Sequence, residues 1–182
     1  MPNHDQTMFE VYLQPGEMFL AREPTMIRTL LGSCVAVSFW SRRIGIGALC
    51  HAMLPRCPEG CALGVSPEVG YRYVDFSIRD IARMFDRLGA NRSEVQIKLF
   101  GGADVLLVGA VNAARATVGS MNCETALEVL RTEGFQIAAS SLRGKTGLNI
   151  HFHTGNGEIR LRRMKRNSGF APAAAGTEGL AV

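Results

Sequence analysis

Cys34 and His51 are the two side chains whose types and spacing point to chemistry in this sequence. Cys34 follows a Gly-Ser pair between two apolar runs, and His51 lies inside a later apolar run that ends at Pro55. A thiol activated by an imidazole attacks carbonyl carbons, provided that the fold brings the two groups together. A short connection at residues 41–43 would join the runs as adjacent antiparallel strands and place Cys34 near His51. Taken alone, the spacing also fits a buried structural cysteine and a core histidine.

A zinc site is a second interpretation of the same region, because thiolate and imidazole are the ligands that zinc prefers. The residues concerned are Cys50, His51, Cys57 and Cys61, with Cys34 as a further ligand. However, the Cys-x3-Cys spacing lies in an irregular stretch without a second spaced pair, and neighbouring residues of a strand point to opposite faces. These two points favour hydrolytic chemistry over a metal-stabilised binding module.

The elements that must position the pair follow from the spacing of apolar residues. Short apolar runs separated by Pro, Gly and Ser predict strands over residues 9–13, 18–21, 26–31, 35–40, 44–54, 95–100, 135–139, 149–152 and 158–162. Apolar spacings of three and four predict helices over 74–88 and 123–131, the second with Asn122 as its N-cap. Residues 154–157 predict a closing hairpin. The order of elements indicates a mixed α/β domain.

The composition predicts one globular domain. The chain has 182 residues, of which 47% are hydrophobic, and we expect the domain to span residues 1–166, with a loose tail over 167–182. The net charge of +4 comes from scattered charges of both signs, which does not indicate nucleic acid. Since no apolar run reaches membrane-spanning length, we expect a cytoplasmic protein without membrane insertion. The odd number of cysteines, five, predicts reduced thiols.

Two motifs together resemble the CheD chemoreceptor glutamine deamidases. The first is Leu31-Gly32-Ser33-Cys34-Val35-Ala36-Val37, and the second, His51-Ala52-Met53-Leu54-Pro55, starts 17 positions after the cysteine. The resemblance covers nearly all of residues 8–164 and continues through Phe100-Gly101-Gly102-Ala103, Val118-Gly119-Ser120-Met121-Asn122, Gly134-Phe135-Gln136-Ile137 and Thr154-Gly155-Asn156-Gly157-Glu158-Ile159.

The resemblance implies a layered α/β/β domain, with mainly antiparallel sheets and two principal helices packed on one side. It also implies hydrolysis of glutamine side chains on methyl-accepting chemotaxis receptors to glutamate, with release of ammonia and without a metal or organic cofactor. Cys34 and His51 occupy the nucleophile and base positions, and a Cys34 thiolate favoured by a nearby imidazolium would form a thioester. The candidate substrate-binding residues are Gly32, Ser33, Gly101 and Gly102, with main-chain N–H groups near Ser33 as oxyanion donors.

Some positions depart from the family's pattern. The family generally has a threonine six residues before the cysteine, where this chain has Arg28. Thr29 is therefore the candidate to orient His51, provided that the strand bulges, because adjacent residues of a regular strand face opposite ways. Arg143 stands at a family glycine and Leu148 at a family arginine, which bears on substrate positioning.

An interaction module is the alternative from another functional class. Such a protein would bind a CheC-type phosphatase or receptors in chemotaxis signalling with little or no catalysis. An assay of receptor deamidation separates the two functions.

Overall fold

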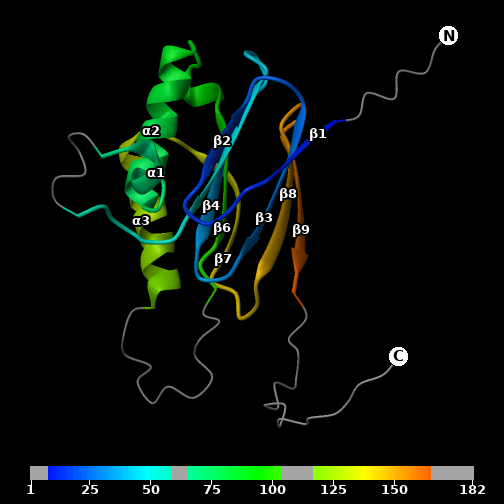
Figure 1. Ribbon diagram of the computed structural model, residues 1–182. Coiled ribbons are helices and arrows are strands. Elements are labelled where there is room, and N and C mark those ends of the chain that lie inside the picture. The colour runs from blue at the N-terminus through cyan, green and yellow to red at the C-terminus, as the bar shows by residue number, and fades with distance from the viewer. Residues whose placement is uncertain (1–7, 59–64, 104–116, 165–182) are drawn as a thin grey trace, which may run out of the picture.

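The computed structural model describes residues 8–58, 65–103 and 117–164. Within these residues nine strands form two sheets (Figure 1): β1 (Phe9–Tyr12), β2 (Met18–Ala21), β3 (Thr25–Leu31), β4 (Val35–Ser41), β5 (Ile46–Ala52), β6 (Gln96–Gly101), β7 (Ile137–Leu142), β8 (Leu148–His153) and β9 (Glu158–Arg163). The helices are α1 (Pro67–Gly70), α2 (Val74–Arg87) and α3 (Val118–Thr132), with a 3-10 turn at Arg92–Glu94. Across the described ranges, no helix is both long and apolar enough to span a bilayer.

The sheets are mainly antiparallel. The first sheet has the strand order β1-β3-β8-β9, and the second has the order β2-β5-β4-β6-β7. The β1–β3 and β6–β7 pairs are parallel, and the other neighbouring pairs are antiparallel. Figure 1 shows α2 and α3 on one side of the second sheet and the first sheet on its other side. The predicted mixed α/β domain, with two principal helices on one side of mainly antiparallel sheets, is confirmed.

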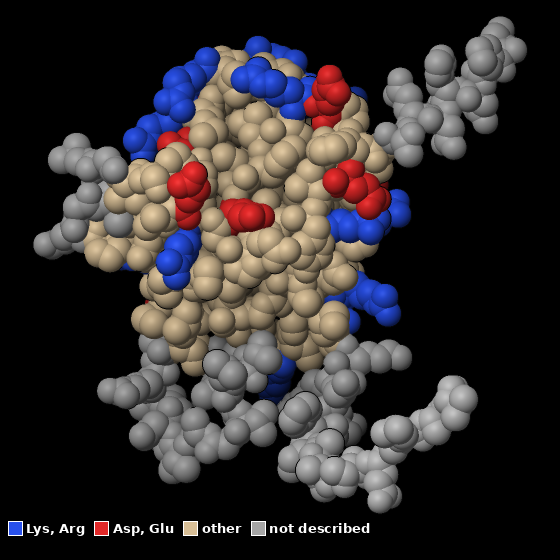
Figure 2. Space-filling model, viewed as in Figure 1, with Lys and Arg blue, Asp and Glu red and all other residues tan. Residues whose placement is uncertain are grey.

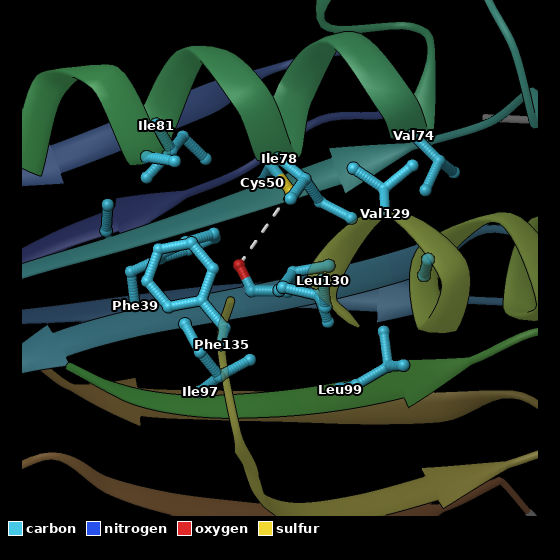
Figure 3. Packing of buried hydrophobic residues seen from close by; sticks show 14 of the residues in the cluster. Phe39, Cys50, Val74, Ile78, Ile81, Ile97, Leu99, Val129, Leu130 and Phe135 are labelled. Atoms are coloured by element: carbon cyan, nitrogen blue, oxygen red, sulfur yellow. Dashed lines mark hydrogen bonds between the residues drawn. The ribbon is translucent and has the colours of Figure 1, made fainter. Parts of the chain in front are cut away.

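Two apolar cores join these layers, because β4 and β5 are buried on both faces. The helix-facing core lies between the second sheet and the two helices and includes Phe39, Cys50, Ile78, Ile97, Leu99 and Leu130 (Figure 3). The inter-sheet core lies between the two sheets and consists of Leu13, Ile27, Leu31, Ala36, Leu49, Phe100, Leu148, Ile150 and Phe152. Because side chains alternate along a strand, each residue of β4 or β5 faces one core or the other.

The start of α3 differs from the prediction. α3 begins at Val118, and its N-cap is Thr117, whose side chain accepts a hydrogen bond from the Ser120 N–H at 3.0 Å. Asn122 is therefore not the N-cap, and it lies fully buried inside the helix. The closing hairpin between β8 and β9 is confirmed, whereas the tail predicted over 167–182 lies outside the described residues.

Candidate functional site

The pairing of β4 with β5 places Cys34 and His51 on the same face of the second sheet. Ala36 of β4 lies opposite His51 of β5. Cys34 precedes Ala36 by two residues, so the two share a face, and Cys34 is a diagonal neighbour of His51 across the strand pair. Cys34 is half-buried and packs against the inter-sheet core. The site therefore lies where β4 begins and β5 ends, on the side of the second sheet that faces the first sheet.

Thr29 of β3 reaches His51 from the first sheet. The Thr29 hydroxyl lies 2.7 Å from His51 Nδ1 and donates its single proton to the Leu13 carbonyl at 2.8 Å. Because that proton is already used, the Thr29 oxygen acts as an acceptor toward His51, so Nδ1 carries the ring proton. The other ring nitrogen, Nε2, is then a free base, and within the described residues it is buried without a hydrogen-bond partner.

Burial keeps both reacting groups neutral at rest. Desolvation lowers the pKa of His51 from its ordinary 6.5 to about 4, and the nearby Leu13 carbonyl and Glu17 carboxylate offset this only in part. Desolvation also raises the pKa of the Cys34 thiol. Both pKa shifts thus favour a neutral thiol and a neutral imidazole at rest, which differs from the thiolate and imidazolium that the resemblance implied.

Three hydrogen bonds hold the Cys34 turn, which we define as residues 32–34. The carbonyl of Gly32 accepts from Ala103 N–H at 3.0 Å, and that of Cys34 accepts from Gly102 N–H at 2.8 Å. The carbonyl of Ser33 accepts from Asn122 Nδ2 at 3.0 Å. Sequence reasoning missed Asn122, because asparagine at that place in the chain resembles a helix cap and nothing local indicates that its side chain reaches the Cys34 turn.

Gly101 and Gly102 lie against the main chain that carries Cys34. Both have positive φ, +113° and +66°, which favours glycine. A Cβ at Gly101 would lie 2.2 Å from the Cys34 carbonyl oxygen, and one at Gly102 would lie 2.1 Å from Cys123 Sγ. These two glycines therefore allow β6 and α3 to approach the Cys34 turn closely; their predicted contact with substrate stays a prediction.

Arg28, which stands at the family's threonine position, and its neighbour Thr29 face opposite sides of β3. Arg28 pairs with Glu10 at 2.7 Å, and both of these side chains are exposed. Thr29 is fully buried beside His51. The β3–β8 register runs from Met26 to Leu31 without a shift, so Thr29 reaches His51 from a regular strand and no bulge is needed.

The other two departures lie at opposite ends of the β7–β8 connection. Arg143 has a φ of +56°, a left-handed conformation that favours glycine, and its N–H donates to the Gly101 carbonyl at 3.0 Å. Leu148 is buried in the inter-sheet core. Arg143 therefore touches the strand end that supports the Cys34 turn, whereas Leu148 belongs to the packing beneath it.

Among the cysteines considered as zinc ligands, Cys34, Cys50 and Cys57 lie within the described residues and do not form a metal-ligating group with His51, whereas Cys61 lies outside them. Cys50 is fully buried in the helix-facing core, where its thiol lies 3.8 Å from the Val37 carbonyl (Figure 3). His51 faces the other side of β5, and Cys57 is disulfide-bonded. Among the residues that the structure describes, no group of three or more His, Cys, Asp and Glu side chains could hold a metal ion. The prediction that all the cysteines are reduced is wrong for Cys57, which is disulfide-bonded, while Cys34, Cys50 and Cys123 are in the reduced state.

A groove of about 750 Å³ borders the strand that carries His51, and its lining includes Leu13, Gly16, Glu17, Met53, Tyr71 and Arg72. Two of these residues bond the main chain of His51: Gly16 N–H donates to the His51 carbonyl at 2.7 Å, and His51 N–H donates to the Glu17 carbonyl at 2.9 Å. The groove thus adjoins the main chain of His51. Figure 2 shows a face with Asp and Glu side chains set among uncharged residues across its middle and Lys and Arg side chains along its upper edge.

Comparison with known proteins gives one family. Residues 53–163 match the family model described as CheD chemotactic sensory transduction. A relative from Geobacter sulfurreducens, named probable chemoreceptor glutamine deamidase CheD 2, is 40% identical over 156 residues, which cover 86% of this chain and 91% of the relative. A second relative, the probable chemoreceptor glutamine deamidase CheD of Maridesulfovibrio salexigens, is 33% identical over 168 residues, covering 92% and 99% of the two chains.

Proposed function

This chain belongs to the CheD family, and from that premise we propose that it converts glutamine side chains of chemoreceptors to glutamate with release of ammonia. The substrate class follows from the names of its relatives, and the proposed roles of the residues follow from the site. Cys34 is the nucleophile, His51 is the general base and acid, and Thr29 orients His51.

The first half of the reaction forms a thioester. His51 Nε2 removes the proton of the Cys34 thiol as Sγ attacks the carboxamide carbon of the glutamine side chain. The carbonyl oxygen becomes an oxyanion, for which main-chain N–H groups of the Cys34 turn are the donors. As the C–N bond breaks, the imidazolium of His51 gives its proton to the departing nitrogen, and ammonia leaves.

The second half uses the same residues in reverse. His51 Nε2 takes a proton from water, and the resulting hydroxide attacks the thioester carbon. The C–S bond breaks, the Cys34 sulfur recovers a proton from His51, and the product is a glutamate side chain. The atoms balance with water as the only co-reactant.

The observation that carries this proposal is His51 Nε2, which is buried without a hydrogen-bond partner among the described residues. A buried ring nitrogen without a partner is costly unless it has a task. Here the Thr29 contact fixes the tautomer that leaves Nε2 as a base, and Nε2 belongs to a side chain on the same face as Cys34. A purely structural histidine would have both nitrogens bonded.

The test is deamidation of receptor cytoplasmic fragments, followed by mass spectrometry of their glutamine-containing peptides. We expect the wild-type protein to convert specific glutamines to glutamate and Cys34→Ala to convert none. Absence of conversion by the folded wild-type protein would contradict the proposed function.

We place the receptor segment that carries the glutamine along the groove beside His51, which is mixed apolar and polar. Three earlier expectations stay predictions: a CheC-type phosphatase as a further partner, a catalytic domain spanning residues 1–166, and action in the cytoplasm, where receptor signalling segments would be reached.

A further inference from the structure

The carbonyl groups of the Cys34 turn all point toward the same side of the molecule. Those of Gly32, Ser33 and Cys34 accept their hydrogen bonds from Ala103, Asn122 and Gly102; Gly102 and Ala103 directly follow β6, and Asn122 belongs to α3. Two of the three donors are main-chain groups, which every sequence would supply. Asn122 is the one side chain among them, so it is the part of this support that the amino-acid sequence specifies.

Because peptide bonds are planar, the hydrogen bonds to these carbonyls also fix the direction in which the N–H groups of Ser33 and Cys34 point. In a planar trans peptide, the C=O of one residue and the N–H of the next point in opposite directions. With the carbonyls of Gly32 and Ser33 directed at β6 and α3, the N–H groups of Ser33 and Cys34 are directed away from them. Within residues 8–58, 65–103 and 117–164, neither N–H donates to another residue.

These two N–H groups are suited to an oxyanion. Donors that stabilise a tetrahedral intermediate must already be aimed at the place where the negative charge develops, close to the attacking atom. The N–H of Cys34 belongs to the nucleophile itself, so it lies close to the attacking sulfur in the covalent structure.

Asn122 is committed to its two donor contacts. Its Nδ2 donates to the Ser33 carbonyl and also to the Met53 carbonyl, each at 3.0 Å. Because both acceptors are carbonyls, only the NH₂ end of the amide can occupy this position. Its Oδ1 is buried and has no partner among the described residues, a loss that costs about 1–3 kcal/mol. The side chain is thus held for what it donates.

Resting on the proposed function, we propose that Asn122 is a positioning residue that aims the Cys34 N–H at the oxyanion of the substrate amide. It does so by fixing the Ser33 carbonyl on the other side of the same peptide plane. Through the Met53 carbonyl it also ties the Cys34 turn to the end of β5, two residues beyond His51. Asn122 touches neither substrate nor reacting atoms.

The test separates aiming the oxyanion donor from holding the thiol. Asn122→Leu has nearly the same size and no donor. We expect its kcat on a receptor fragment to fall about 10- to 100-fold, less than the loss for deleting an oxyanion donor outright, with KM within about threefold. Alkylation of Cys34 by iodoacetamide forms no oxyanion, so its rate should stay within about threefold of wild type.

Val129→Ala is the matched control. Val129 lies in the same helix and is buried in the helix-facing core, and its apolar side chain cannot hydrogen-bond to the Cys34 turn. Its kcat should match wild type despite lower stability. Equal falls in kcat and alkylation rate for Asn122→Leu would overturn the inference, as would an unchanged kcat or an equal loss in Val129→Ala.

A second variant covers failure of Asn122→Leu to fold. Asn122→Ser has a smaller side chain that keeps one hydroxyl donor. We therefore expect its kcat to lie between that of wild type and that of an enzyme lacking an oxyanion donor, and its alkylation rate to match wild type. A wild-type kcat in this variant would overturn the inference. If the wild-type protein itself does not deamidate receptor fragments, the proposed function fails; if only the Asn122 variants behave like wild type, this inference alone fails.

Discussion

The two faces of β5 hold cysteine and histidine in opposite settings. Cys50 and His51 are neighbours in the sequence, yet Cys50 enters the helix-facing core and His51 faces the first sheet. Burial raises the pKa of Cys50 to about 12, and its thiol has a main-chain carbonyl as partner. One ring nitrogen of His51 has no hydrogen-bond partner within the part of the chain that the structure describes, and the half-buried Cys34 lies on its side of the sheet.

This difference shows what turns a cysteine into a nucleophile in this fold. Free thiols are common in cores and inert there, because burial without a nearby base leaves the thiol protonated. Cys34 is also raised in pKa by desolvation. What distinguishes it is a base on the same face and a turn that leaves it partly exposed, so position on the sheet matters more than the thiol's own acidity.

The largest effect that tests this comparison is expected from exchanging each sulfur for oxygen. Cys34→Ser replaces the nucleophile with a hydroxyl that His51 cannot readily deprotonate, so we expect deamidation of receptor fragments to fall by about 10³-fold or more. Cys50→Ser places a hydroxyl in the helix-facing core and should lower the melting temperature while leaving kcat within about twofold. A loss of activity in Cys50→Ser at temperatures where it is folded would break the comparison.

The next effect is the pH dependence of stability that a buried neutral His51 produces. Its pKa is about 4 in the folded protein against 6.5 ordinarily, so above pH 6.5 both states hold the ring neutral. Between pH 6.5 and 4 the unfolded chain binds a proton that the folded chain does not. The free energy of unfolding should therefore fall by about 3 kcal/mol across that window as the pH falls.

Urea denaturation of wild type and His51→Gln at a series of pH values measures this contribution. Glutamine does not titrate, so the wild-type curve should lose stability toward pH 4 more steeply than that of the variant. Parallel curves would show that His51 is protonated as readily in the folded protein as in the unfolded chain. The inference that His51 is neutral in the resting protein would then be wrong.

A third comparison uses the two faces of β3. Thr29→Val removes the hydroxyl that fixes the His51 tautomer, and we expect kcat to fall about 10- to 100-fold, as for other groups that orient a catalytic imidazole. Thr29→Ser should keep most of the activity, because it retains the hydroxyl. Arg28→Ala is the control from the opposite face and should stay within about twofold of wild type; a larger loss there would move the orienting role back to position 28.

Local patterns predicted the elements, and long-range contacts decided the details of the site. The β4–β5 pairing and the closing hairpin follow from apolar runs and turn residues near them in the chain. The choice between Arg28 and Thr29 does not, because β3 carries apolar residues on both of its faces and its alternation is ambiguous. Asn122 suits a cap by residue type, but its partners, Ser33 and Met53, are 89 and 69 residues away.

The smallest expected effect concerns Arg143, whose main-chain N–H, and not its side chain, contacts the strand end beside the Cys34 turn. At a φ of +56° its Cβ is disfavoured by about 1 kcal/mol, and its ion pair with Glu124 at 3.1 Å is exposed and contributes little. Arg143→Gly should raise the free energy of unfolding by about 0.5 kcal/mol, since relief of strain exceeds the added entropy of the unfolded chain. Arg143→Ala loses the same ion pair but keeps a Cβ, so it should be less stable than Arg143→Gly by about 0.5 kcal/mol in urea denaturation, which is the relief of strain less the entropy that glycine adds to the unfolded chain. If Arg143→Ala proves the more stable of the two, the left-handed turn is not strained, and the glycine expected there from the family resemblance has some other cause.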